Sequence, residues 1–236
     1  MIRRLPAEKM GGSNLGWLRS KFHFSFAEYY NEENINFGVL RVINDDLVSA
    51  GGGFPSHPHR DMEIISYVVN GHLTHKDSMG NESSIGRGEV QYMSAGTGVL
   101  HSEYNNDSEE VRLLQIWILP DKRNHIPNYG EYKFKWEERE DKFLHMVSSK
   151  EGDAPVKINQ DVNFYVIELS KDKEESFEIK EGRQAYMVQI EGKSLVNDIE
   201  MNTRDGLESI GESLKIKALE KSHFLIIEMQ EREDLK

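Results

Sequence analysis

The stretch HPHRDMEIISYVVNG, residues 57–71, decides how the rest of the chain can be understood. A β-strand sends successive side chains to opposite faces, so His57 and His59 point the same way if this segment is extended. The same spacing separates His101 from Glu103. If the two segments face each other across a barrel, three imidazoles and one carboxylate converge. Such a set suits a divalent transition metal with open positions for water, oxygen or substrate.

Outward from this stretch, short strand patterns and turns follow one another closely. Asn70-Gly71 is typical of a two-residue hairpin turn. Residues 113–119 form a nearly continuous apolar run, which Pro120 ends. Alternation predicts one inward face for a set of side chains that begins at the histidines: His59, Asp61, Glu63, Ile65, Tyr67 and Val69. Strands this short, at this spacing, predict an all-β sandwich or barrel.

The bulk composition limits the class of protein. The chain has 236 residues, enough for one large β domain or two small ones. Its formal net charge of −12 disfavours direct binding to nucleic acid or to an anionic membrane. No apolar window approaches the roughly 20 residues of a membrane span. No signal-peptide pattern follows Met1, so we expect a cytoplasmic protein.

The spacing of the histidines is the most specific signal in the chain. His57, His59 and Glu63 follow the spacing of the first cupin motif, and residues 88–105, which include His101, resemble the second. A lone histidine is more often a hydrogen-bonded structural residue than a ligand, and a purely structural cluster is the alternative here. The chain has no cysteine, so any metal must be held by His, Asp, Glu or backbone oxygen. We therefore predict a metal site at this cluster.

Longer motifs narrow the resemblance. They are FSFA at residues 24–27, FGVLRV at 37–42, HPHRDME at 57–63, MSAGTGVLHSE at 93–103 and LQIW at 114–117. These segments resemble the pirin family, densely over residues 12–120 and only in rhythm beyond them. The resemblance implies an all-β bicupin of two β-barrel (jelly-roll) domains, with metal only in the N-terminal barrel. It also implies the metal ligands, which are His57, His59, His101 and Glu103.

The chain changes character at residues 121–157, which carry proline, glycine and a charged run. We expect an N-terminal metal-binding cupin domain at 1–130, a connection at 131–157 and a degenerate C-terminal cupin domain at 158–236. The C-terminal part has no His-x-His pair, and its His223 stands alone. That barrel should therefore be free of metal.

The neighbours of the predicted ligands allow more than one interpretation. Glu63 shares the expected inward face, so it is either a fifth ligand or a hydrogen-bond partner that fixes an imidazole tautomer. We favour the second role. His75 and Asp77 alternate on the return strand, where a structural pair is a better interpretation than a catalytic one. His23, flanked by phenylalanines, is expected to be a surface or packing residue.

The resemblance to the pirin family implies a function. Bacterial members are known as quercetinases, metal-dependent dioxygenases that open the central ring of a flavonol and release carbon monoxide. The expected substrates are a flavonol-like enol and O2, with Glu103 or Glu63 accepting the hydroxyl proton of the enol. Eukaryotic pirin implies an alternative, an iron-dependent transcriptional co-regulator that acts through protein partners. A third interpretation is a stable metal-binding barrel with only incidental activity.

The predicted ligands do not decide which metal binds. Imidazole and carboxylate suit Fe, Ni, Cu, Zn, Co or Mn. The resemblance points to iron, so one Fe2+ is our expectation. We also expect a monomer.

Overall fold

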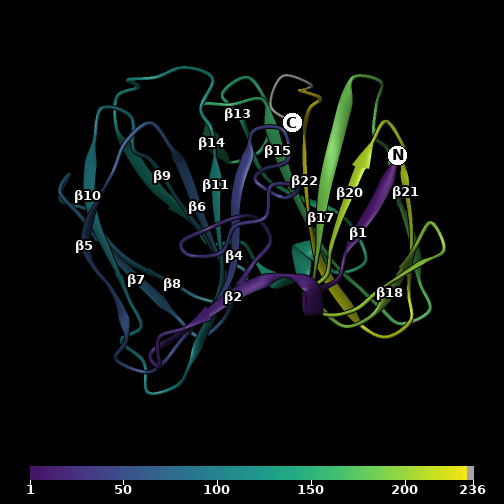
Figure 1. Ribbon diagram of the computed structural model, residues 1–236, viewed down its shortest axis with the longest axis horizontal. Helices are drawn as coiled ribbons and strands as arrows, with labels where there is room; N and C mark the ends of the chain where they lie inside the picture. The colour runs from purple at the N-terminus through teal and green to yellow at the C-terminus, as the bar shows by residue number, and fades with distance from the viewer. Residues whose placement is uncertain (233–236) are drawn as a thin grey trace.

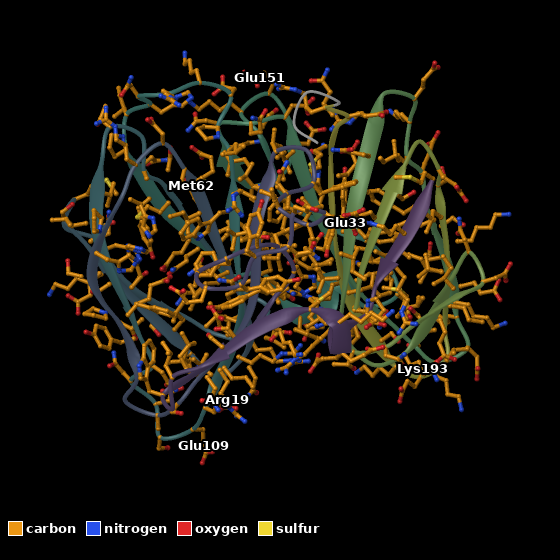
Figure 2. The ribbon with its side chains drawn as sticks, in the orientation of Figure 1. Arg19, Glu33, Met62, Glu109, Glu151 and Lys193 are labelled. Carbon is orange, nitrogen blue, oxygen red and sulfur yellow. The ribbon has the colours of Figure 1, made fainter. Side chains whose placement is uncertain are left out.

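The computed structural model describes residues 1–232, and its regular secondary structure is almost entirely β-strand. Figure 1 shows two lobes side by side, each built from one larger and one smaller sheet. Charged side chains such as Arg19, Glu109 and Glu151 lie on the outside of these lobes (Figure 2). The two-lobed arrangement confirms the predicted all-β bicupin.

The N-terminal barrel carries the predicted metal ligands. Its larger sheet has the strand order β12 (Asn128–Tyr132), β9 (Val90–Ser94), β6 (Glu63–Asn70), β11 (Val111–Ile118), β4 (Leu40–Val48), β3 (Leu18–Phe22) and β2 (Gly11–Asn14). Its smaller sheet has the order β5 (Gly53–His59), β10 (Val99–Tyr104), β7 (Leu73–Asp77) and β8 (Glu82–Ile85).

The C-terminal barrel repeats this plan. Its larger sheet has the order β1 (Ile2–Leu5), β20 (Gly206–Ile210), β17 (Arg183–Glu191), β22 (Ser222–Gln230), β15 (Val162–Leu169), β13 (Leu144–Ser149) and β14 (Val156–Ile158). Its smaller sheet has the order β16 (Glu174–Phe177), β21 (Leu214–Ala218), β18 (Ser194–Val196) and β19 (Ile199–Met201). The helices of the described residues are the short 3-10 turns η1 (Ala7–Lys9) and η2 (Trp136–Arg139). Within residues 1–232, no helix has the length and apolar character that crossing a membrane requires.

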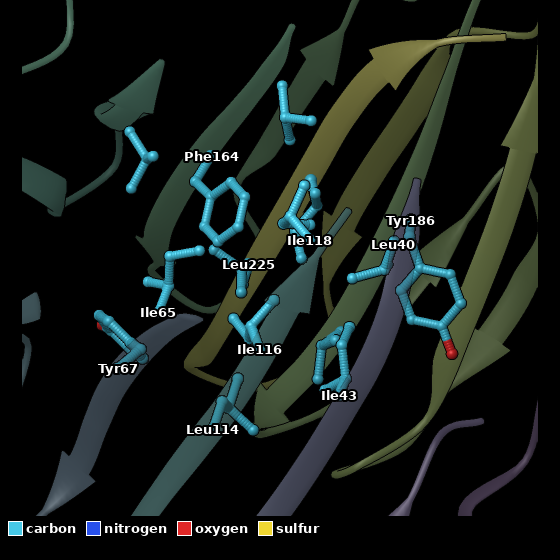
Figure 3. Close-up of a cluster of buried hydrophobic side chains, with 14 of the residues drawn as sticks. Leu40, Ile43, Ile65, Tyr67, Leu114, Ile116, Ile118, Phe164, Tyr186 and Leu225 are labelled. Carbon is cyan, nitrogen blue, oxygen red and sulfur yellow. The ribbon is translucent and has the colours of Figure 1, made fainter. Parts of the chain in front are cut away.

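The larger sheets of the two barrels pack against each other. Figure 3 shows apolar side chains of β4, β6 and β11 meeting those of β15, β17 and β22 in one buried cluster. Its members include Leu40, Ile43, Ile65, Leu114, Ile116, Phe164, Tyr186 and Leu225. Each barrel also has apolar clusters of its own. The two barrels therefore share a hydrophobic core, which we call the joint core.

Strand β6 is buried on both faces, which changes the expected direction of its side chains. Ser66 and Val68 face the interior of the N-terminal barrel, whereas Ile65 and Tyr67 pack in the joint core. Glu63 lies two positions before Ile65, so its side chain points to the same face of β6 as Ile65 and Tyr67. The predicted single inward face that starts at the histidines and continues along β6 is therefore wrong.

Strand pairing also differs from the expected domain ranges. β1 belongs to the C-terminal sheet, where it pairs with β20, and Figure 1 shows the chain crossing from there to β2 in the other lobe. Near the expected connection at 131–157, β12 pairs with β9 of the N-terminal barrel, whereas β13 and β14 join the C-terminal sheet. This segment therefore belongs to both barrels. Residues 233–236 of the expected C-terminal domain lie outside the described residues.

Candidate metal centre

Strands β5 and β10 bring the three histidines together. They are antiparallel neighbours, and their register pairs His101 with His57 and Val99 with His59. Pro58, between the first two histidines, is exposed, so both rings take the other face of β5. Proline lacks the N–H that an inner strand must donate, and β5 accommodates it because this strand lies at the edge of its sheet.

The nitrogens of the three rings converge. His57 Nε2 and His101 Nε2 are 3.1 Å apart, and the ligand atoms of His57, His59 and His101 all lie within 4.8 Å of one another. Metal–nitrogen bonds of about 2.1 Å that meet at about 90–110° hold two nitrogens about 3.0–3.4 Å apart. The donor set and the separation of His57 Nε2 from His101 Nε2 therefore fit a first-row divalent metal.

In two of these histidines, Nδ1 is the ring nitrogen that points away from the cluster, and its hydrogen bond orients the ring. His57 Nδ1 donates to the carbonyl oxygen of Pro55 at 2.8 Å, which leaves the lone pair of Nε2 directed at the cluster. His101 Nδ1 lies 3.4 Å from His75 Nδ1, and His75 Nε2 lies 3.1 Å from Asp77 Oδ2. If each far nitrogen donates to the next group, the chain ends on the Asp77 carboxylate. His101 Nε2 then keeps a free lone pair for a metal.

The contact between His75 and His101 is one that the sequence does not indicate. The predicted structural pair of His75 and Asp77 is present and buried, and His75 also stacks on Tyr129 at 4.2 Å. Among residues 1–232, a second group of side chains able to hold a metal is His75, His101 and Glu103. Alternation along β7 predicts the pair, but the link to His101 arises from the pairing of β7 with β10. That pairing joins distant segments and leaves no local signal in the sequence.

Burial favours the neutral form of two of the clustered histidines, His59 and His101. Desolvation, together with the proximity of His57, lowers the pKa of His59 to about 4. Desolvation and the neighbouring histidines together lower the pKa of His101 to about 3. Neutral imidazole is the form that binds a metal. The rings are therefore held in the protonation state that a ligand needs.

Glu103 lies in the same cavity and is held by polar side chains. Its buried carboxylate accepts hydrogen bonds from Ser66 Oγ at 3.0 Å, from Gln115 Nε2 at 2.7 Å and from Gln91 Nε2. Burial raises the pKa of Glu103 to about 7, and these hydrogen bonds oppose the rise. The carboxylate is thus fixed in position and binds a proton more readily than an exposed glutamate.

Glu63 does not face the histidines. Its carboxylate accepts hydrogen bonds from Ser94 Oγ at 2.7 Å and from the backbone and side-chain amides of Asn159, each at 3.1 Å. The turn between β5 and β6 holds Asp61 in the left-handed region, with φ of 49°, and breaks the alternation between the two strands. The expectation that Glu63 is a ligand, a tautomer-fixing partner or a proton acceptor is therefore corrected. Through its hydrogen bonds with Asn159, Glu63 instead connects β6 to the segment that follows β14 in the C-terminal barrel.

The histidines and Glu103 line a cavity of about 350 Å³. Apolar side chains form most of the remaining wall: Trp17, Phe22, Phe26, Phe54, Ile64 and Trp117. Trp117 packs edge-on against His59 at 5.0 Å between ring centres, and Phe26 packs edge-on against Trp117 at 5.6 Å. A polar cluster in an apolar cavity is typical of sites for small molecules.

Comparison with known proteins places this architecture in a family. The Pirin family profile matches residues 5–118, and a profile described as the quercetinase C-terminal cupin domain matches residues 145–229. A pirin-like protein of Caulobacter vibrioides is 40% identical over 97% of this chain and 99% of its own length. This chain belongs to the pirin family. The two matches fall on the two barrels of this pirin and confirm the resemblance predicted from the motifs.

A relative and a solved structure from Escherichia coli are similar to this pirin over most of its length. The quercetin 2,3-dioxygenase of strain K12 is 41% identical over 88% of this pirin and 89% of the relative. The structure of the bacterial pirin YhhW in complex with nickel(II) matches with a TM-score of 0.93 and 38% identity, covering 98% of this chain and 100% of that one.

Proposed function

We propose that this pirin is a metal-dependent dioxygenase that opens the central ring of flavonols with O2 and releases carbon monoxide. The observation that carries the proposal is the convergence of His57, His59 and His101 within 4.8 Å of one another at the wall of an apolar cavity. Glu103 adds a buried carboxylate to that cavity. A relative named quercetin 2,3-dioxygenase, 41% identical, supports the same class of reaction.

In this proposal His57, His59, His101 and Glu103 would hold one divalent metal. When bound, the metal would supply Lewis acidity that lowers the pKa of the substrate enol and would promote the reaction of the enol with O2. We expect iron in this role. Nickel is the second candidate, because the related pirin of Escherichia coli forms a complex with nickel(II).

The protein's own contribution begins with the proton of the substrate enol. We assign its acceptance to the Glu103 carboxylate, which is buried in the same cavity as the three histidines. Ser66 and Gln115 hold the carboxylate while the proton moves. Glu63, the other glutamate considered as a base, is bonded to Asn159 and takes no part.

The aromatic wall contributes binding and shielding. Phe26, Phe54 and Trp117 offer ring surfaces to a flat substrate. A substrate seated among them displaces water from the cavity. Electrostatic interactions between Glu103 and the reacting hydroxyl are stronger where water is excluded.

Turnover of quercetin tests the proposal. Protein reconstituted with iron, nickel, copper, cobalt or manganese is supplied with quercetin, and the loss of quercetin absorbance is followed together with O2 uptake. We expect equimolar consumption with at least one metal, and loss of both metal and turnover in His57→Ala and His101→Ala. Glu63→Gln is the matched control. Its carboxylate lies outside the cavity, so this variant should keep its metal and its turnover.

Two results would contradict the proposal in different ways. Metal-loaded protein that consumes no quercetin with any of these metals is not a quercetinase, and the iron-binding regulatory protein then becomes the better function. Metal content that is unchanged in both histidine variants would remove the metal site itself. The monomeric state and the cytoplasmic location stay predictions.

A further inference from the structure

The cavity has a second polar wall on strand β4. Asn44 and Asp46 line the cavity, whereas Asp45 points toward the C-terminal barrel and pairs with Arg112 at 2.6 Å and with Arg204 at 3.2 Å. β4 belongs to the larger sheet, and the strands that carry the three histidines, β5 and β10, belong to the smaller one. The polar groups of β4 and the metal cluster therefore face the same cavity from different sheets.

Both side chains are almost completely buried, and each has an oxygen atom without a partner. Asn44 is 5% exposed and Asp46 is 2% exposed. Within residues 1–232, no group donates a hydrogen bond to Asn44 Oδ1 or to Asp46 Oδ1. Burial raises the pKa of Asp46 to about 7, although a hydrogen bond from Ser20 opposes the rise. Buried polar atoms without partners are rare in folded proteins, and each one calls for an explanation.

The surrounding wall indicates which kind of ligand would donate hydrogen bonds to these two oxygens. The neighbours of Asn44 and Asp46 around the cavity include the apolar side chains Leu18, Phe22 and Phe26. A flat ligand with one oxygen at the histidines meets apolar surface over most of its area. A hydrocarbon edge placed against β4 leaves both oxygens desolvated and unpaired, whereas a hydroxyl group donates to them.

We propose that Asn44 and Asp46 form a hydrogen-bond-accepting subsite for hydroxyl groups on the part of the substrate remote from the metal-bound oxygen. This inference rests on the proposed function and adds a substrate class to it. The preferred substrates are flat aromatic enols that carry ring hydroxyls, rather than enols with bare hydrocarbon rings. Asn44 and Asp46 are specificity-determining residues and do not touch the reacting atoms.

Binding of two ligands to the metal-loaded protein tests the subsite. Quercetin carries hydroxyl groups on both outer rings, whereas 3-hydroxyflavone has the same enol and none of those hydroxyls. Trp17 and Trp117 line the cavity, so quenching of their fluorescence reports both affinities. We expect the wild type to bind quercetin about 10–100-fold more tightly than 3-hydroxyflavone. In Asp46→Leu, which replaces both carboxylate oxygens with methyl groups, this preference should fall to about threefold or less.

Phe26→Leu is the matched control, because it reduces the apolar wall and leaves both acceptors in place. It should weaken the binding of the two ligands by similar factors. If Asp46→Leu does not fold, Asp46→Asn provides the same comparison, since a neutral amide oxygen accepts a weaker hydrogen bond than a carboxylate. Its preference should also fall below that of the wild type.

The binding readout separates this inference from the proposed function. A preference for quercetin that is unchanged in the Asp46 variant overturns the subsite, whether or not the protein oxidises quercetin. A preference that is present in the wild type and lost in the variant supports the subsite, even if neither ligand is turned over.

Discussion

His101 belongs to both groups of side chains that are able to hold a metal. Its Nε2 lies 3.1 Å from His57 Nε2, and its Nδ1 lies 3.4 Å from His75 Nδ1. Asp77 holds the far side of His75 at 3.1 Å. A ligand ring that is oriented before the metal arrives loses less freedom when the metal binds. His75 and Asp77 are therefore positioning residues for His101.

We expect His75→Ala and Asp77→Asn to lower the affinity for the metal by about 10–100-fold, although neither change removes a proposed ligand. The affinity is measured by competition with a chelator of known strength. His72→Ala is the control, because His72 is exposed and its ring bonds to Asp107. If His75→Ala, His72→Ala and the wild type bind the metal with equal affinity, His75 does not position His101 for metal binding.

The sequence predicts which histidines come together better than it predicts where the residues around them point. The alternation of His57 with His59 within one strand is a local property, and the structure brings their rings together with that of His101. The direction of Glu63 depends on one intervening turn, in which Asp61 adopts φ of 49°. Alternation does not carry across such a turn, so the pattern predicts the wrong face for Glu63.

Strands β4, β6 and β11 lie between the cavity and the joint core. Their side chains are buried on both faces, so apolar residues occupy successive positions and the usual contrast between inward and outward residues is lost. The sequence therefore predicts that these strands exist but not which residues face the metal site. Gln115 and Asp46 are polar residues in these strands, and both face the cavity.

The segment after β3 carries a buried histidine that is sensitive to pH. His23 is expected at the surface or in packing, and the structure buries it completely and bonds its Nδ1 to Tyr186 Oη of the C-terminal barrel at 2.9 Å. Burial lowers the pKa of His23 to about 4 from an ordinary value of 6.5. Between these values the unfolded chain takes up the proton and the folded protein does not. The free energy of unfolding therefore falls as the pH falls through this window.

We expect His23→Gln, which has no titrating ring, to lose about 3 kcal/mol less stability than the wild type between about pH 7 and about pH 4. Urea unfolding of both proteins at several pH values measures this difference. The remaining titrating groups are common to both proteins and cancel. Parallel pH profiles for the variant and the wild type would show that His23 is protonated in the folded state.

The two barrels are joined by a buried polar network as well as by the joint core. Arg139, at the end of η2, is fully buried and donates to Tyr67 Oη at 2.6 Å and to the carbonyl oxygen of Gly88 at 2.8 Å. Tyr67 Oη also lies 2.8 Å from His223 Nε2. The sequence suggests that His223 stands alone, but the structure pairs it with Tyr67. The network therefore connects β6 with β22. Because η2 falls in the irregular connection, no periodic pattern predicts this contact.

We expect Arg139→Met to lower the free energy of unfolding by about 2–4 kcal/mol, because it removes two hydrogen bonds from buried acceptors. Both barrels should still unfold in one transition, since they share the joint core. Tryptophan fluorescence and far-ultraviolet circular dichroism measured against urea test both points. Arg60→Ala, at an exposed arginine, is the control and should change stability by less than about 0.5 kcal/mol. Two separate transitions in the wild type would contradict a shared core.

The pairing of β1 with β20 determines the order in which the molecule can be completed. The amino group of Met1 donates to the carbonyl oxygen of Ile210 at 2.9 Å, across a separation of 209 positions. During synthesis on the ribosome, β1 emerges before β20 and has to wait for this partner strand until residues 206–210 have been made. Contacts between such distant segments form late and slow the search for the native topology. If the N-terminal barrel folds before residues 206–210 have been made, it does so while the strand that precedes it is still unpaired.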